Sequence, residues 1–218
     1  MPETSAPKPT VPYRQIRANY DSNTIIVYQA YSNSIASAAV AAQSLGASPL
    51  FKRTRMTWIK PSWCWMLYRA GYSFKDAGQE RILAIKMTHE GFLKMLRRAE
   101  LTTEHKDGEE PVSGKKDEGK GAVVKVQWDP ERGPRLEKLT HRSIQIGIPQ
   151  GLIEKWTVEW IVGIEDVTEK AKKLKEYLDE HSDATVETLV AEGLVPEERP
   201  FELPEDLVDL LRMRSNEE

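Results

Sequence analysis

Cysteine and histidine are scarce in this sequence. Of its 218 residues, one is a cysteine, Cys64, and four are histidines. A single thiol excludes an internal disulfide and a zinc site built from several cysteines. Four scattered histidines also give no reason to expect a structural metal. Cys64 stands between two tryptophans with no histidine close in sequence, which is typical of an inert buried thiol rather than a nucleophile.

Long apolar runs are absent as well. No stretch approaches the roughly twenty apolar residues that a membrane-spanning helix needs. Residues 1–15 also lack the apolar segment of a secretory signal. We therefore expect a cytoplasmic protein, with the nucleus as the alternative, and no membrane partner.

None of the common catalytic motifs occurs. The sequence has no G-x-x-x-x-G-K-[ST] loop, no G-x-G-x-x-G fingerprint, no G-x-S-x-G and no H-E-x-x-H. Common NTPases, Rossmann dehydrogenases, serine hydrolases and zinc proteases are therefore not favoured.

Charge is unevenly distributed along the chain. Residues 1–100 carry fourteen lysines and arginines against six acidic residues, whereas residues 101–218 carry seventeen against twenty-eight. A positive first half favours an anionic partner such as a nucleotide or a nucleic acid. The alternative is that the acidic half forms solvated helix faces and the arginines are structural.

The order of strand and helix signals predicts a single α+β domain. Runs of β-branched and aromatic residues predict strands at 24–31, 80–87, 122–129, 142–148 and 159–167. Capping residues and helical spacing predict helices at 32–46, 61–71, 88–100, from Thr168 onward, and near the end of the chain. Because strands and helices do not alternate regularly, we expect one mixed or antiparallel sheet of about five to six strands with flanking helices.

The domain is predicted to span residues 13–180. Polar composition predicts a disordered leader at 1–12 and a mobile insertion at 101–121. Residues 181–218 are predicted to form a C-terminal helical tail.

The segment RMTWIKPSWCWMLYRAGY at 55–72 holds three of the six tryptophans, with two arginines and a lysine. In a helix through this segment, Trp65 and Arg69 lie four residues apart on one face. Trp63 and Trp65 cannot both face the core squarely. One of them is expected to meet the side formed by residues 55–60, where its ring could hold a base or a nicotinamide. The alternative is that these aromatic side chains are all core.

Two other stretches carry polar side chains on or beside predicted strands. Arg17 precedes the strand that carries Tyr28 and Gln29. A guanidinium offers two parallel donors to phosphate, and a tyrosine ring can stack on a base. The alternative pairs Arg17 with Asp21 or a later glutamate and places Tyr28 in the core. In RSIQIGI, Gln145 is on the strand face opposite the isoleucines and is expected to point into a cleft or into solvent.

Six segments in this order resemble the family known as domain of unknown function 4291. They are IRANYD, VYQAYS with SIA, RMTWIKPSWCWMLYRAG, QERILAI, VQWDPER and RSIQIGIP. The likeness runs from about Arg17 to about Asp166 and brings no activity with it.

The order of elements is more distantly similar to the ADP-ribosyltransferases of the DNA-modifying toxin type. The similar segments are VYQAYSNSIASAA, KPSWCWMLY, ILAIKMTHEGFLKML and a late strand followed by proline. This resemblance implies an ADP-ribosyltransferase-like fold, NAD as the substrate, and a glutamate on the late strand that polarises the ribose. Gln145 stands at that position, and glutamine can hydrogen-bond a ribose hydroxyl but cannot take a proton.

Two functions are therefore considered. The first is an NAD-type nucleotide-binding protein, with ADP-ribose transfer to a nucleic-acid or nucleotide acceptor as the implied activity. The second is a non-catalytic module that binds single-stranded nucleic acid through stacking aromatic side chains, although a pI of about 5.9 weighs against it. For the first function the expected catalytic residues are Gln145 and Tyr28, and the expected cofactor-binding residues are Arg17, Gln29, Arg55, Trp58, Lys60, Tyr68 and Arg69.

Overall fold

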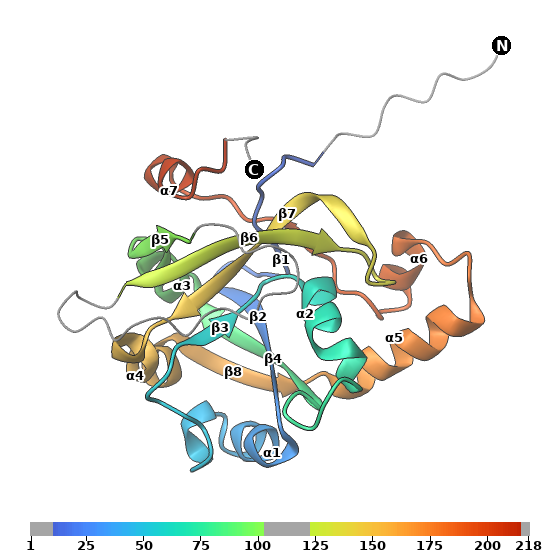
Figure 1. The fold of residues 1–218 in the computed structure, drawn as a ribbon, viewed down its shortest axis with the longest axis horizontal. Coiled ribbons are helices and arrows are strands. Elements are labelled where there is room, and N and C mark those ends of the chain that lie inside the picture. The colour runs from blue at the N-terminus through green and yellow to red at the C-terminus, as the bar shows by residue number, and fades with distance from the viewer. Residues whose placement is uncertain (1–10, 103–122, 215–218) are drawn as a thin grey trace.

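The structure is a computed structural model that describes residues 11–102 and 123–214 (Figure 1). The strands in this part of the chain are β1 (Arg17–Ala18), β2 (Thr24–Tyr31), β3 (Thr57–Ile59), β4 (Arg81–Thr88), β5 (Ala99–Leu101), β6 (Val124–Arg132), β7 (Lys138–Ile148), β8 (Ile161–Asp166) and β9 (Arg199–Pro200). The α-helices are α1 (Asn33–Ala42), α2 (Trp63–Ala70), α3 (His89–Leu96), α4 (Ile153–Lys155), α5 (Thr168–Glu180), α6 (Val186–Ala191) and α7 (Glu205–Leu210). Short helical turns are η1 (Leu45–Ala47), η2 (Gly71–Ser73), η3 (Gln150–Leu152) and η4 (Trp156–Trp160).

The strands form three sheets. One has the order β2-β4-β8 and is antiparallel throughout. The second has the order β3-β7-β6-β5, with β5 parallel to β6, and β1 pairs with β9 in a small third sheet. The two larger sheets meet where Tyr28 and Lys60 exchange backbone hydrogen bonds, with N···O distances of 2.7 and 3.3 Å. Beyond this bridge the two sheets separate.

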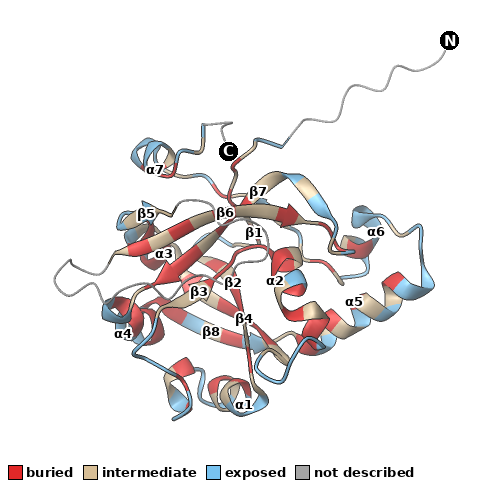
Figure 2. Ribbon diagram, in the orientation of Figure 1, coloured by how far each residue is buried: buried red, intermediate tan, exposed pale blue. Residues whose placement is uncertain are grey.

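Alternation along the central strands divides the core into two clusters of buried residues. Figure 2 shows buried residues on the strands of both larger sheets. Val27 and its partner Ile85 face the four-stranded sheet in the larger cluster of buried residues. Their neighbours Tyr28 and Ala84 face the opposite way, toward α2 and α5, in a second cluster. Because both faces of β2 and β4 are covered, these strands are apolar almost continuously rather than in strict alternation.

Helix α2 lies between the sheets and packs on β2 and β6. It begins where the Ser62 hydroxyl accepts a hydrogen bond from the Trp65 amide at 3.1 Å, and it ends at Gly71, whose φ of 55° is left-handed. On the other side of the molecule the Gln43 side chain hydrogen-bonds both the N–H and the C=O of Ile164. This amide caps the outer edge of β8 in the way a neighbouring strand would.

The predicted α+β class and the strand at 24–31 are confirmed. The prediction of one sheet of about five to six strands is wrong, because the strands form three sheets. The additional strands β1, β3, β5 and β9 have two or three residues each, too few to display a period-two pattern.

The segment expected as a C-terminal tail, 181–218, packs on the domain over most of its described length. Phe201 and Leu207 belong to the larger core cluster, and Leu189 belongs to the second. The pairing of β9 with β1 adds backbone hydrogen bonds to this packing. Most of the expected leader and of the expected mobile insertion lie outside the described residues. No helix in the described part of the chain is long and apolar enough to cross a membrane.

Candidate functional site

A cavity of about 810 Å³ opens where the two larger sheets separate. Its walls come from the end of β2, from β3, from one face of α2, from the two loops that precede β3 and follow η2, and from the cavity side of β6 and β7. The residues whose polar side chains line it are Tyr28, Gln29, Tyr31, Ser32, Lys52, Arg55, Thr57, Trp58, Lys60, Trp65, Tyr68, Arg69, Lys75, Asp76, Gln79, Gln127, Asp129 and Gln145.

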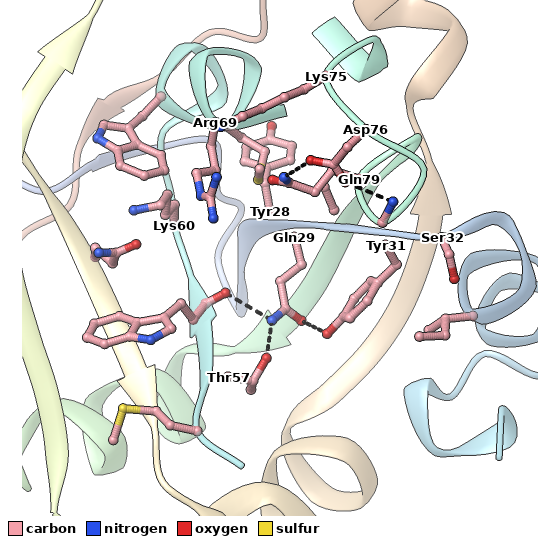
Figure 3. A pocket seen from close by; sticks show the side chains of 18 of the residues that line it. Tyr28, Gln29, Tyr31, Ser32, Thr57, Lys60, Arg69, Lys75, Asp76 and Gln79 are labelled. Carbon is pink, nitrogen blue, oxygen red and sulfur yellow. Dashed lines mark hydrogen bonds between the residues drawn. The ribbon is translucent and has the colours of Figure 1, made fainter. Parts of the chain in front are cut away.

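Eight of the nine site residues predicted from the sequence therefore share one cavity; the exception is Arg17. Five of the lining side chains are lysine or arginine and two are aspartate. An excess of positive charge in a concave site favours an anionic ligand. Figure 3 shows Lys60, which directly follows β3, and Arg69 of α2 projecting into the same space.

Gln29 connects the two sheets below the cavity (Figure 3). Its side-chain amide donates hydrogen bonds to Thr57 Oγ1 at 2.7 Å and to the Trp58 carbonyl at 2.9 Å. Its Oε1 accepts a hydrogen bond from the Tyr31 hydroxyl at 2.9 Å. Both amide hydrogens are thus used inside the protein, so Gln29 positions β3 rather than offering donors to a ligand. Burial raises the pKa of Tyr31 to about 12, which keeps its hydroxyl protonated as a donor.

Lys60 is the most enclosed cation of the site. Its side chain is 5% exposed, and its Nζ lies 3.4 Å from Asp129 Oδ2. The same Nζ lies over the Trp65 ring, 2.8 Å from the ring centroid. Burial lowers the pKa of Lys60 well below its usual range, and the Asp129 carboxylate acts in the opposite direction.

The face of β6 and β7 that borders the cavity is polar. Gln127 and Asp129 alternate along β6 with buried residues of the core, and Gln145 lies opposite Gln127 on β7. Gln145 donates a hydrogen bond from its side-chain amide to Gln127 Oε1 at 2.6 Å. The sequence placed Gln145 on the face opposite the isoleucines, and this is where the structure has it.

Trp58 lies against the backbone of β7 at Gly147, its partner in the β3–β7 pairing. A Cβ atom at Gly147 would come within 3.0 Å of the Trp58 ring and 2.7 Å of Met56 Sδ. The absence of a side chain at Gly147 therefore lets the indole ring lie flat beside the cavity.

Two of the predicted site residues, Tyr28 and Tyr68, have rings that already contact other side chains of the protein. Tyr28 lies on the α2 side of β2, with its ring centroid 5.2 Å from that of Trp63, and burial raises the pKa of its hydroxyl well above the usual range. Tyr68 is 42% exposed, and the Arg132 guanidinium covers its ring at 3.8 Å from the centroid. One face of Tyr68 is thus already occupied by a cation.

Arg17 does not meet the other predicted residues, which corrects the expectation that it holds a phosphate in the same slot. Its guanidinium donates to the Glu198 carbonyl at 2.8 Å and to Gln15 Oε1 at 3.1 Å. It therefore fastens β1 to the C-terminal segment. The alternative from the sequence was an ion pair with Asp21 or a later glutamate. The partner is a later glutamate, Glu198, but the hydrogen bond goes to its backbone carbonyl and not to its carboxylate.

The three tryptophans of the 55–72 segment, Trp58, Trp63 and Trp65, differ in burial and in what their rings contact. Trp63 and Trp65 are both buried, with 1% and 8% exposure, although only one was expected to face the core. Trp65 does meet Lys60, but one face of its indole is covered by that ammonium. Trp58 is half-buried and is the tryptophan of this segment best placed to contact a ligand.

Sequence reasoning missed several polar residues of the cavity, among them Thr57, Gln127 and Asp129. The alternation of Gln127 and Asp129 with apolar residues in VKVQWD was a usable signal. To use this signal, one would have had to know that the strand VKVQWD pairs with the strand that carries Gln145.

Comparison with known proteins gives one finding on the family. The family described as domain of unknown function (DUF4291) matches residues 15–201 of the chain. A search of curated proteins found no match to this chain. The match extends past β8 as far as β9, which agrees with the packing of the C-terminal segment on the domain.

Proposed function

We propose that this chain, which belongs to the family described as domain of unknown function (DUF4291), binds a dinucleotide of the NAD type in the cavity beside α2 and transfers its ADP-ribose to a nucleotide or nucleic-acid acceptor. The observation that carries the proposal is the convergence of eight predicted residues on one cavity. These residues come from three separate parts of the chain, 28–29, 55–69 and 145, so sequence proximity does not account for the meeting of the three parts.

The size and charge of the cavity support a dinucleotide. A volume of about 810 Å³ is within the range of roughly 300–1,000 Å³ typical of small-molecule sites. NAD carries two negative charges on its pyrophosphate, and the side chains of Lys60 and Arg69 lie near each other in the cavity. An arginine fork and a lysine ammonium are the usual protein donors to phosphate oxygens.

Flat and amide-bearing side chains support recognition of the ring systems. The ring of Trp58 offers a surface for a nicotinamide or an adenine. Gln145 and Gln127 present amide groups that can hydrogen-bond ribose hydroxyls or a carboxamide. Because a glutamine cannot take a proton, Gln145 would orient the ribose, and the carboxylate needed for transfer would come from elsewhere.

Titration calorimetry with NAD, ADP-ribose, ATP and GMP tests the binding proposal. We expect NAD and ADP-ribose to bind the full-length protein, and Lys60→Met to weaken both at least tenfold because it removes a buried cation. Arg55→Ala should have a smaller effect, since Arg55 is exposed at the mouth. If none of these ligands gives a heat of binding at millimolar concentration, the proposal is refuted.

The alternative function, binding of single-stranded nucleic acid, is tested by gel shift at two salt concentrations. A nucleic-acid module should bind tightly at low salt and lose affinity steeply as salt rises, because many phosphate contacts release counterions. A mononucleotide or dinucleotide site should show a shallow dependence, since it contacts only one to three phosphates.

A further inference from the structure

The cavity is lined by two carboxylates that differ in their surroundings. The Asp76 carboxylate accepts hydrogen bonds from the Gly78 amide at 2.8 Å and from the Gln79 side chain at 2.7 Å, and so shapes an exposed loop. Asp129 instead projects from β6 toward the cavity, with Oδ2 3.4 Å from Lys60 Nζ. Asp129 is therefore the carboxylate of the cavity floor.

Asp129 and Gln145 share one face of the sheet. Strand pairing places Gln127 opposite Gln145 and Asp129 opposite Ser143, so Asp129 is the diagonal neighbour of Gln145. Diagonal neighbours on adjacent antiparallel strands are about 7–8 Å apart, within reach of a single ligand. A ribose bound against Gln145 can therefore meet this carboxylate as well.

Lys60 holds the Asp129 carboxylate in place. Its ammonium is confined between Asp129 and the Trp65 ring, with little room to move toward solvent. The other charged groups close to Lys60 are Arg69 of α2 and Glu131 of β6. An enclosed cation beside a partly exposed carboxylate keeps the carboxylate oriented while leaving it open to the cavity, since Asp129 retains 27% side-chain exposure.

We infer that Asp129 is the carboxylate that takes the proton of the acceptor during ADP-ribose transfer, and that Lys60 is the residue that positions it. This inference rests on the proposed function. It also separates two tasks, because Gln145 would hydrogen-bond the ribose while Asp129 receives the proton.

The step balances without a further reactant. The bond between ribose C1′ and the nicotinamide ring nitrogen breaks, and its electron pair stays on that nitrogen, which neutralises the pyridinium. A lone pair of the acceptor oxygen or nitrogen forms the new bond to C1′. The proton of the acceptor passes to the Asp129 carboxylate and then to water. With water as the acceptor, the products are ADP-ribose and nicotinamide.

Two measurements on the full-length protein test the inference: the affinity for NAD by titration calorimetry and the rate of nicotinamide release by chromatography at saturating NAD. Asp129→Asn should leave the Kd within threefold and slow release by roughly 100-fold or more, because a positioned proton acceptor contributes about 10²–10⁴ in rate. Asp129→Glu, which keeps the carboxylate, should retain at least a tenth of the rate. The matched control is Asp179→Asn, an exposed partner of Lys175 on α5, which should change neither quantity.

Lys60→Gln tests the positioning role. Without the ammonium, the acidic limb of the pH profile of release should move to higher pH, whereas a purely structural loss would lower the rate at every pH alike. Thermal unfolding of each variant confirms that it is folded at the assay temperature.

The outcomes distinguish this inference from the binding proposal. If folded Asp129→Asn keeps more than a third of the wild-type rate, the inference is overturned. If wild-type protein binds NAD but releases no nicotinamide above background, the inference is also overturned, while the binding proposal stands. If wild-type protein does not bind NAD, both fail.

Discussion

Replacement of Gln29 by leucine tests whether this residue holds the two sheets together below the cavity. Gln29 is 4% exposed and makes three hydrogen bonds, to Thr57, Trp58 and Tyr31. Each such bond contributes about 1 kcal/mol net. Leucine retains most of the buried apolar volume, so the loss is chiefly that of the hydrogen bonds. We therefore expect Gln29→Leu to lower the free energy of unfolding by about 3 kcal/mol.

Urea unfolding followed by circular dichroism measures this change, and the slope of the transition shows whether the folded state is equally compact. The control is Gln79→Leu, which removes a single hydrogen bond to Asp76 on an exposed loop and should cost less than about 0.5 kcal/mol. A loss below about 1 kcal/mol for Gln29→Leu would refute the reasoning. Gln29 would then be free to serve the ligand instead of the scaffold.

Three further predictions concern other parts of the molecule. Burial and the nearby Glu131 raise the pKa of Glu198 well above its usual range, so its contribution to stability is full below the ordinary pKa near 4.5 and is lost as pH rises through the folded value. Glu198→Gln should therefore gain stability relative to wild type as pH rises from 4.5 to 7, by about 1 kcal/mol or more in urea unfolding. Gly147→Ala should displace the Trp58 ring, cost about 1–3 kcal/mol and change the tryptophan fluorescence. Arg17→Ala should lower stability by about 1–2 kcal/mol while leaving the calorimetric Kd for NAD unchanged, because Arg17 is outside the cavity.

Each of these three predictions has a control variant or a result that would contradict it. Glu202→Gln removes an exposed carboxyl, and an equal pH trend in that variant would show that the Glu198 effect is not specific. A Cβ atom at Gly163 would lie 3.5 Å from Lys86 Cβ, which is an ordinary van der Waals contact, so Gly163→Ala should leave the tryptophan fluorescence unchanged. If folded Arg17→Ala lost NAD binding, Arg17 would have to contribute to the binding site, which would contradict this prediction.

Local patterns predicted much of the fold. The run of β-branched and aromatic residues at 24–31 is the observed β2, and the Thr88 and Gly71 signals mark where α3 begins and α2 ends. These features depend on neighbouring residues alone. The division into three sheets depends on pairing between distant segments, such as β1 with β9, and two-residue strands leave no periodic trace in the sequence.

The candidate site was predictable in composition and less so in arrangement. Residue types suited to phosphate and to flat rings marked Lys60, Arg69 and Trp58, which do share the cavity. The same reasoning could not separate Arg17 from them, because an arginine that holds phosphate and one that fastens a chain segment look alike in sequence. Nor could it show that the amide hydrogens of Gln29 are already used, since this depends on the approach of β3.

The most direct test of the account is a crystal structure of the protein soaked with NAD. The account predicts electron density for the dinucleotide in the cavity, with the pyrophosphate beside Lys60 and Arg69, one ring system against Trp58 and the nicotinamide ribose facing Gln145. An empty cavity at saturating NAD, or a dinucleotide bound on a different face, would contradict it.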